Sequence, residues 1–172
     1  DYGAPDFVLK ARMESVLKKA NPSNKTILPS KLNSNYKKTP KNRLRRTRLY
    51  IPGNQPKLML NAAIHEPDGI IIDLEDSVSP DEKTSARIIA GYAFNNIDFL
   101  QSERMLRINQ GNIGYEDLEH LIPSNVQTIL VPKVEYKEQI TDIEKLIKNI
   151  KLKHNINSTT FLIPIIESPL GV

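Results

Sequence analysis

Residues 68–80, DGIIIDLEDSVSP, constrain the fold more than any other stretch of the chain. Gly69 opens a run of three isoleucines. A β-branched apolar run bounded by turn residues predicts a strand that is buried on both faces. Ser79 and Pro80 then form a typical helix start, with an N-cap candidate and a proline at the first helical position. Three acids lie between the strand and the helix: Asp73, Glu75 and Asp76. The active-site residues of α/β folds lie at the carboxyl ends of parallel strands, which is where these acids are expected.

From Arg48 onward, short apolar runs alternate with helical patterns, which predicts a parallel sheet. The expected strands are residues 48–51, 69–74, 105–108, 128–131 and 161–166. The expected helices are residues 56–65, 80–95, 115–121 and 140–155.

Two parallel layouts compete, an open doubly wound sheet and a closed (β/α)8 barrel. A dinucleotide-binding sheet needs a glycine-rich turn after its first strand, and Pro52-Gly53-Asn54 lacks the GxGxxG spacing. A barrel instead collects its site from many strand ends. Polar residues follow four expected strands here: Glu75 and Asp76, Arg107, Lys133 and Glu167. We therefore expect an α/β chain forming a truncated (β/α)8 TIM barrel, with about five of eight βα units present, preceded by a short helix and a linker.

Composition excludes several classes of protein. A chain of 172 residues is long enough for one ordinary domain. It has no cysteine, so disulfides and thiolate metal sites are excluded. No apolar run approaches the roughly 20 residues of a membrane span, and the first residues lack a signal pattern. We expect a soluble, cytoplasmic protein. Because the sequence starts without Met and stops just after a strand-like run, we also expect a piece of a longer protein.

The first part of the chain is basic. Residues 1–48 carry 13 Lys and Arg against 3 Asp and Glu, whereas the remainder is acidic. Residues 6–20 have the spacing of an amphipathic helix, and residues 21–44 the composition of a linker. The run KKTPKNRLRRTR, residues 37–48, has two interpretations, a patch that binds an anionic polymer or a solvated linker. The linker is favoured because no aromatic platform accompanies the charges, and we expect no nucleic-acid partner.

The residues at the strand ends suit one kind of chemistry. Glu75, Asp76 and Glu167 offer hard oxygen ligands for Mg²⁺. Arg107 offers a planar fork for a carboxylate. A cation and an arginine that converge on one oxo acid would stabilise an enolate, as metal-assisted aldol cleavage requires. Each residue alone has a structural alternative, such as a helix cap, an ion pair or a surface lysine. Agreement at four strand ends favours a site. The three histidines have no ligand spacing and are interpreted as structural.

The chain also resembles a known family. From Arg45 onward it is similar to the citrate lyase β subunit, within the HpcH/HpaI aldolase superfamily that also holds malyl-CoA and citramalyl-CoA lyases. The matching stretches are RRTRLYIPGN (45–54), DGIIIDLEDSVSPDEKTSAR (68–87), LRIN (106–109), LVPK (130–133) and IIESPLGV (165–172). The pairing of LEDSV with IESPLG is specific and favours citrate lyase over its CoA-dependent relatives.

The resemblance implies roles for these residues. Glu167 matches the family's direct Mg²⁺ ligand and a substrate contact, and Arg107 matches the arginine that binds the oxaloacetate-type carboxylate. Glu75 and Asp76 match the acidic pair that supports the metal's water shell and the substrate. Lys133 is expected to bind substrate.

The same resemblance bears on the thioester. Tyr50 and Gly53 match the place where a phosphopantetheine-like arm approaches. Lyases that use free CoA tend to carry a basic pair nearby, where this chain has Gln55 and Asn61. An acyl carrier is therefore the expected bearer of the thioester arm.

Residues 1–20 resemble the C-terminal end of the citrate lyase acyl carrier (γ) subunit. The implied organisation is a carrier end at 1–20, a linker at 21–44 and the N-terminal part of a citrate-lyase-type barrel at 45–172. A tether of this kind raises the effective concentration of the arm at the barrel. The implied partners are the γ and transferase (α) subunits of a citrate lyase complex, with a homo-oligomer when the protein is complete.

The expected activity is Mg²⁺-dependent cleavage of citryl thioester to oxaloacetate and an acetyl thioester. We expect the 172-residue piece itself to be inactive, because the family takes a second metal carboxylate from the strand after Glu167. The enzymatic alternative is a malyl-CoA or citramalyl-CoA lyase. The non-enzymatic alternative is a protein that binds an anionic polymer through its basic head.

Overall fold

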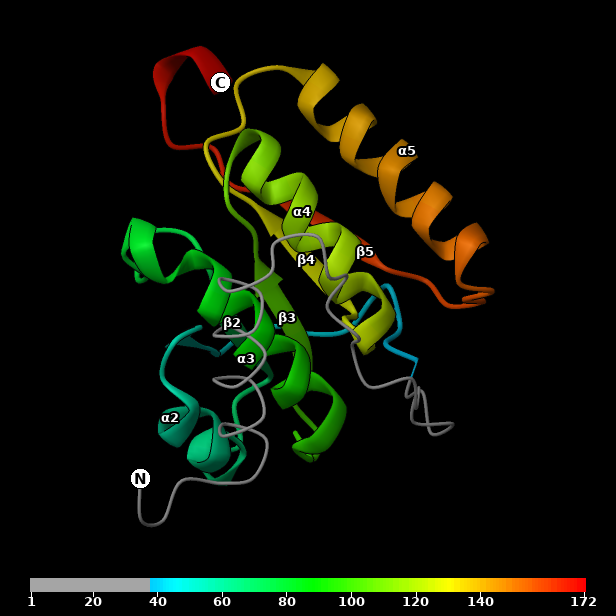
Figure 1. Cartoon of the computed structure of the whole chain (residues 1–172). Helices are drawn as coiled ribbons and strands as arrows, with labels where there is room; N and C mark the ends of the chain where they lie inside the picture. Colours follow the sequence, from blue (N-terminus) through cyan, green and yellow to red (C-terminus); the bar gives the residue numbers. More distant parts are fainter. Residues whose placement is uncertain (1–37) are drawn as a thin grey trace, which may run out of the picture.

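The computed structural model describes residues 38–172. Within them, five strands form one parallel sheet in the order β1-β2-β3-β4-β5 (Figure 1). The strands are β1 Arg48–Pro52, β2 Gly69–Asp73, β3 Glu103–Arg107, β4 Thr128–Val131 and β5 Phe161–Pro164. The α-helices are α2 Pro56–Asn61, α3 Lys83–Asn96, α4 Gly111–Leu121 and α5 Lys137–Lys153. Short 3₁₀ turns are η1 Ala62–His65, η2 Pro80–Glu82, η3 Ile122–Ser124 and η4 Pro169–Gly171.

The alternation of strands and helices that the sequence predicts is confirmed. The predicted strand 69–74 is β2, whose five residues are all buried. The predicted helix 6–20, and residues 21–37 of the predicted linker, lie outside the described residues.

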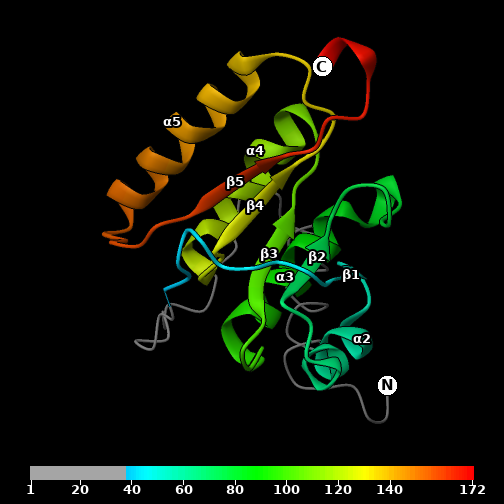
Figure 2. The same ribbon diagram turned by 180° about the vertical axis from the view of Figure 1, so that it is seen from behind.

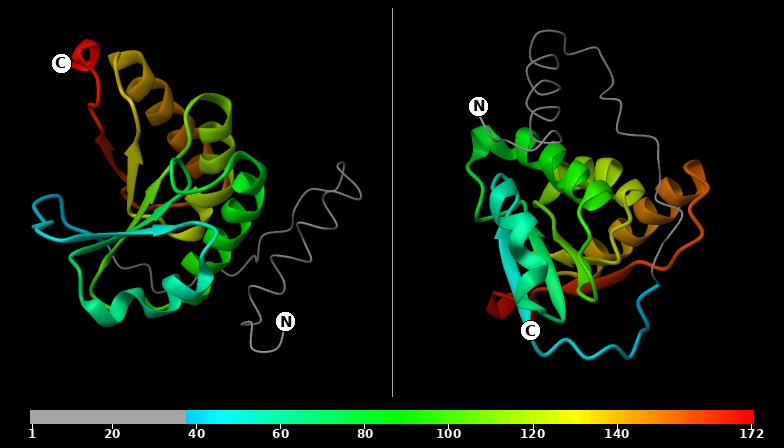
Figure 3. Two further views of the ribbon diagram at one scale, coloured as in Figure 1. Left: turned by 90° about the vertical axis from the view of Figure 1, so that its left-hand side faces the viewer. Right: turned by 90° about the horizontal axis from the view of Figure 1, so that it is seen from below.

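The strand order follows the chain order without reversal. A doubly wound sheet reverses its order at a switch point, whereas the wall of a (β/α)8 barrel does not. These five strands therefore have the order of a barrel wall, and closure into a full barrel stays a prediction. Figure 3 shows how strongly the sheet twists between β1 and β5.

Helices α3, α4 and α5 lie side by side over one face of the sheet, which Figure 2 shows from behind. The main core fills the space between this helical layer and the sheet, with fully buried residues such as Ile70, Ile72 and Leu106. On the opposite face a smaller cluster gathers Ile71, Met105 and Leu130. Because both faces are covered at β2 and β4, these two strands are buried at every position and carry apolar runs rather than an alternating pattern.

The helix bounds differ from the sequence prediction by a few residues: α5 begins at Lys137 instead of residue 140, and the predicted helix 80–95 begins with the turn η2. The predicted helix 56–65 tightens into η1 after Asn61 and ends at Glu66, whose φ of 48° is left-handed; Pro67 follows, and a proline disfavours helical backbone in the residue before it. Helix α4 begins at Gly111, four residues before the predicted start. Gly114 allows this because a Cβ there would lie 2.0 Å from the carbonyl oxygen of Asn109.

Residues 38–47, named the strap here, run along the amino ends of the strands as the blue-to-cyan segment of Figure 2. Glu103, 1% exposed, accepts hydrogen bonds from Arg45 Nε (2.5 Å) and Nη2 (2.8 Å) and from the Thr39 and Thr128 hydroxyls. Arg46 forms an ion pair with Asp68 at 3.0 Å. The strap is thus fastened to the start of β3 and to the turn before β2.

No helix within residues 38–172 is long and apolar enough to cross a membrane.

Candidate active site

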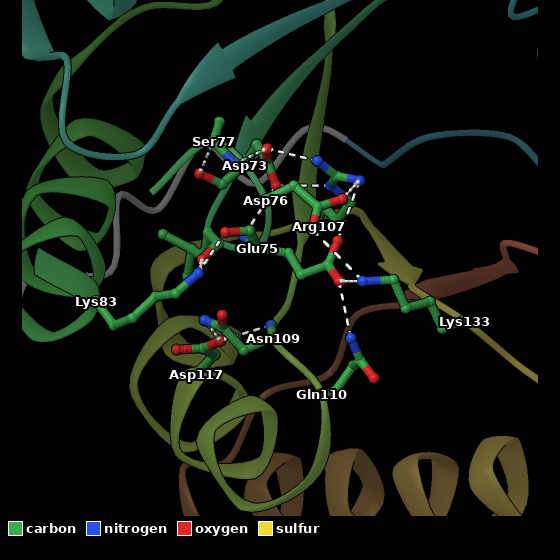
Figure 4. A network of polar contacts seen from close by, with 11 residues as sticks. Asp73, Glu75, Asp76, Ser77, Lys83, Arg107, Asn109, Gln110, Asp117 and Lys133 are labelled. Atoms are coloured by element: carbon green, nitrogen blue, oxygen red, sulfur yellow. Dashed lines mark hydrogen bonds and ion pairs between the residues drawn. The ribbon is translucent and has the colours of Figure 1, made fainter. Parts of the chain in front are cut away.

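Asp73 and Arg107 are partners in the parallel register of β2 and β3, so their side chains emerge together at the carboxyl edge of the sheet. Asp73 Oδ1 accepts from Arg107 Nε at 2.6 Å, and Oδ2 accepts from Nη2 at 2.7 Å (Figure 4). This is a bidentate pair with two parallel, charge-assisted hydrogen bonds. It raises the pKa of the arginine above its ordinary value, so Arg107 is a permanent cation here.

Asp73 also shapes the loop that follows it. Its carboxylate accepts from the backbone N–H groups of Glu75 (2.9 Å) and Ser77 (3.2 Å), while the Ser77 hydroxyl donates back to the Asp73 carbonyl. Burial alone would raise the pKa of Asp73, but the bonds from Arg107, Ser77 and Glu75 together lower it. Asp73 is therefore an ionised centre that binds both the arginine and the acidic loop.

Glu75 points into the same site and is only 5% exposed. Its Oε1 accepts from Lys133 Nζ at 2.8 Å and from Gln110 Nε2 at 2.9 Å. Its Oε2 is buried without a hydrogen bond and faces Arg107 Nη1 at 3.2 Å. One carboxylate thus connects the ends of β2, β3 and β4, and it keeps an oxygen whose hydrogen-bonding capacity is unused.

Asp76 lies at the open side of the cluster, with a side chain that is 60% exposed. Its oxygens are 3.4 Å from Arg107 Nη1 and 3.5 Å from Lys133 Nζ. Burial works against its charge, yet the neighbouring cations Lys133 and Arg107 lower its pKa below the ordinary value. Asp76 is therefore an ionised carboxylate at the rim.

Lys133 occupies an unusual backbone position. Its φ of 49° is left-handed, which is uncommon for a residue with a side chain. Such conformations persist where the surroundings hold them and are concentrated at functional sites. The hydrogen bond to Glu75 is the largest cause that raises the pKa of Lys133, so this group stays a cation.

Two residues of α3, Lys83 and Arg87, support the loops that carry the site. Lys83 donates from Nζ to the carbonyl oxygens of Leu74 (2.6 Å) and Glu75, and desolvation lowers its pKa. Arg87 Nε donates to Asp117 Oδ1 at 2.7 Å, and both side chains are buried.

Asp117 connects this pair to the loop after β3. Its Oδ2 accepts from the backbone N–H of Asn109 at 2.9 Å and from Asn109 Nδ2 at 2.8 Å (Figure 4). These bonds fix the residue that precedes Gln110.

Tyr50 and Gly53, which the sequence assigns to a thioester arm, lie in different surroundings. The guanidinium carbon of Arg107 is 5.3 Å from the centre of the half-exposed Tyr50 ring, a cation–π distance. Gly53 is buried, and a Cβ there would lie 2.5 Å from Leu74 Cδ2. Packing alone thus accounts for the glycine, and its role toward an arm stays a prediction.

Glu167 is exposed and follows β5. It forms no hydrogen bond or ion pair with another residue of the described range. No group of three or more His, Cys, Asp or Glu side chains is placed to hold a metal within residues 38–172. The assignment of Glu167 as the metal ligand therefore stays a prediction.

The structure therefore brings together Glu75, Asp76, Arg107, Lys133 and Tyr50 among the residues that the sequence assigns to the site. It adds three that the sequence reasoning did not assign: Asp73, Lys83 and Gln110. Asp73 was visible as the acid that ends the isoleucine run, but its partner lies 34 residues away.

Three arginines in the described part of the basic segment make contacts within the molecule. Arg45 pairs with Glu103 and Arg46 with Asp68, while Arg43 donates to the carbonyl oxygens of Asp68 and Gln101. Three of the charges that would attract an anionic polymer are thus used to fasten the strap.

The sequence model of the family described as HpcH/HpaI aldolase/citrate lyase matches residues 46–172. The chain belongs to this family. The predicted resemblance is confirmed. Members of the HpcH/HpaI aldolase/citrate lyase family that are similar to the chain include the citrate lyase subunit beta of Leuconostoc mesenteroides subsp. cremoris, 36% identical over 133 residues, and the human mitochondrial citramalyl-CoA lyase, 32% identical over 136.

These matches cover 76% and 74% of the chain but 44% and 39% of the two relatives, so the chain spans less than half their length. A crystal structure of the CitE protein of Mycobacterium tuberculosis in complex with magnesium, acetoacetate and coenzyme A is 25% identical, with a TM-score of 0.56. That match covers 74% of the chain and 43% of the solved one.

Proposed function

We propose that the protein containing this chain is a Mg²⁺-dependent carbon–carbon lyase that cleaves a citryl thioester to oxaloacetate and an acetyl thioester. One observation carries this proposal. Arg107 and Lys133, from two strand ends, converge on the acids of a third, Glu75 and Asp76. Cationic donors beside carboxyl side chains suit the binding of an α-oxo acid together with a metal ion.

The donor set can be tested against Mg²⁺ itself. This ion prefers oxygen ligands and commonly binds through one or two carboxylates while keeping several waters. Glu75 Oε2 is a buried carboxylate oxygen without a hydrogen bond, and Asp76 is an ionised carboxylate at the rim. Acids of this kind fit an ion that retains its waters, with Glu167 proposed as the direct ligand. When bound, Mg²⁺ would polarise the carbonyl of the oxo acid.

The residues of the chain would divide the remaining work. Arg107 would hold the carboxylate of the oxo-acid end, because its charge is permanent and its guanidinium is fixed by Asp73. Lys133 would donate to a second oxygen of the same end. As the carbon–carbon bond breaks, the hydroxyl of the citryl group would lose its proton and become the carbonyl of oxaloacetate. The bonding electrons would pass to the thioester fragment as an enolate, which takes up a proton to become the acetyl thioester.

The thioester is proposed to be carried by an acyl carrier. Gln55 precedes α2 and Asn61 ends it; both are exposed and uncharged, so neither position offers a cation to the phosphates of CoA. The ring of Tyr50 lies at the entrance beside Arg107, where the arm is proposed to pass. The proposed partners are therefore an acyl carrier (γ) and a transferase (α) subunit.

The decisive experiment compares substrates with the native full-length protein. Citryl-carrier and citryl-CoA thioesters are offered with Mg²⁺, and the release of oxaloacetate is measured. We expect cleavage of the carrier thioester, its loss when EDTA removes Mg²⁺, and its loss in Arg107→Ala. The absence of oxaloacetate from both thioesters would refute the proposed activity.

A citramalyl-CoA or malyl-CoA lyase is the second candidate. It is favoured by the 32% identity to human citramalyl-CoA lyase and by the coenzyme A present in the CitE complex. The same assay with citramalyl-CoA and malyl-CoA separates the two, since a preference for these substrates would replace the citryl-carrier assignment.

A further inference from the structure

We propose that Asp73 is a positioning residue that turns one particular edge of Arg107 toward the oxo acid. The inference rests on the proposed function, because it concerns how Arg107 meets that substrate. Its starting point is the side-on contact in which Asp73 occupies Nε and Nη2 of the guanidinium at 2.6 and 2.7 Å (Figure 4).

A guanidinium has five N–H donors in a rigid plane, and a carboxylate can bind either its side, through Nε and one Nη, or its end, through both Nη groups. Asp73 uses the side. The end of Arg107 remains, and there Nη1 faces Glu75 Oε2 at 3.2 Å and Asp76 Oδ2 at 3.4 Å. An incoming carboxylate must therefore bind Arg107 end-on.

The acids at that end are held less closely than Asp73. The contacts of Nη1 are 0.5 Å or more longer than the two bonds to Asp73, and Asp76 is largely exposed. Hydrogen bonds between charged groups weaken with length beyond about 2.9 Å. The contacts with Glu75 and Asp76 are thus the ones that a substrate carboxylate displaces, while Asp73 stays in place.

Burial supports the assignment. Asp73 is 2% exposed, and its oxygens are also fixed by the backbone N–H groups of Glu75 and Ser77. The carboxylate cannot follow the arginine if Arg107 rotates, so the plane of the guanidinium is set by the loop that carries Glu75. The arginine and the acid pair are therefore oriented by one residue.

The test uses calorimetry to measure the Kd of oxaloacetate, with Mg²⁺ present, for the full-length wild type and for four variants of it. Arg107→Ala should abolish binding. Asp73→Asn keeps the size but removes the charge and one acceptor, so we expect the Kd for oxaloacetate to rise about tenfold or more. Asp73→Glu restores the charge on a longer side chain and should give an intermediate Kd.

Ser77→Ala is the matched control. It removes the hydroxyl that bonds the Asp73 carbonyl but leaves the contact with Arg107. A loop defect alone would weaken binding in Ser77→Ala as well, whereas the proposal requires a Kd close to that of the wild type. Inhibition by the acetyl thioester product should be equal in all Asp73 and Ser77 variants, since that product lacks the oxo-acid carboxylate.

The outcomes separate the two hypotheses. Retained oxaloacetate binding in Arg107→Ala would overturn the proposed function. If Arg107→Ala loses oxaloacetate binding while Asp73→Asn and Ser77→Ala have the same Kd, only the proposed role of Asp73 is overturned. If Asp73→Asn does not fold, Asp73→Glu decides, because an unchanged Kd in that variant contradicts a fixed end-on edge.

Discussion

Lys133 donates to Glu75 at 2.8 Å and so connects the end of β4 to the end of β2 across the intervening β3. The contact pairs a lysine side chain that is 43% exposed with a glutamate side chain that is 6% exposed. Solvent screens the half-exposed lysine, and Arg107 lies beside Glu75 as a second cation, so the contact matters more for orientation than for stability. It directs an ammonium group into the site from a backbone that is left-handed at Lys133.

Lys133→Met should therefore reduce turnover far more than stability. We expect kcat/KM for the citryl thioester to fall about 100-fold, the scale for removing one charged donor from a catalytic site, with an unchanged unfolding midpoint. Steady-state kinetics and thermal unfolding measure the two effects. Lys137→Met, four residues along on an exposed lysine, is the control and should leave both unchanged. Equal kinetic losses in the two variants would contradict a specific role for Lys133.

The buried pair between Arg87 and Asp117 predicts a large stability effect. Asp117→Asn leaves Arg87 with only the exposed Glu116 as an acidic partner, and breaking a buried pair of this kind costs about 3–5 kcal/mol. Glu116→Gln, which breaks a contact of the same arginine with a 65% exposed side chain, should cost at most about 1 kcal/mol. Urea unfolding of both variants gives the comparison. A cost below that of Glu116→Gln would show that the pair is not structural.

The first turn of α4 predicts that two glycines respond differently to replacement by alanine. Gly114→Ala places a Cβ 2.0 Å from a backbone oxygen, so we expect a cost at the upper end of the roughly 1–3 kcal/mol typical of overpacking. Gly111→Ala meets no atom within 4 Å, and its cost comes only from a φ of +57°, about 1–2 kcal/mol. Only Gly114→Ala should also shift the loop that carries Gln110, and so raise KM. Urea unfolding compares the stability losses of the two variants, and steady-state kinetics compares their KM values. A larger stability loss in Gly111→Ala than in Gly114→Ala would contradict the prediction.

Glu103 predicts a pH dependence of folding. Burial alone would raise its pKa, but hydrogen bonds from Arg45, Thr128 and Thr39 lower it below the ordinary value of 4.5. A carboxyl whose pKa is lower in the folded state stabilises the protein above its unfolded pKa and loses that contribution as the pH falls through the folded value. The advantage of the wild type over Glu103→Gln should thus be full above about pH 5 and shrink below about pH 4.5.

The free energy of unfolding, measured in urea between pH 3 and pH 7 or so, checks this expectation. Glu119→Gln, a change on an exposed position of α4, should give a curve parallel to that of the wild type. A constant difference between wild type and Glu103→Gln would show that Glu103 does not titrate with folding.

The strands were predictable because each contains a short apolar run; β2 and β4 are buried on both faces, and β4 matches its predicted bounds of 128–131. Their order and parallel direction followed from the helices between them. The early start of α4 was not predictable from local signals, since Gly111 and Gly114 are typical of loops. Gly114 is needed only because Asn109 packs against it, which is a tertiary contact.

The candidate site was predictable in outline for a similar reason. Parallel strands bring their carboxyl ends to one edge, so Glu75, Arg107 and Lys133 had to lie near one another. The contact of Asp73 with Arg107 depends on strand register, which no single run of sequence specifies. The pairing of Arg45 with Glu103, 58 residues apart, could not be predicted from the sequence either. Without that pairing, the basic segment is interpreted only as a solvated linker or a patch for an anionic polymer.

Substitutions at the two edges of the sheet should cause two different kinds of defect. Glu103 and its partners lie at the amino edge of the sheet, whereas Glu75, Arg107 and Lys133 lie at the carboxyl edge, a full strand length away. A substitution at the amino edge should therefore lower the amount of folded protein in a cell and leave each surviving molecule with normal kinetics. A substitution at the carboxyl edge should leave abundance intact and produce an inert protein that still occupies its place in any assembly.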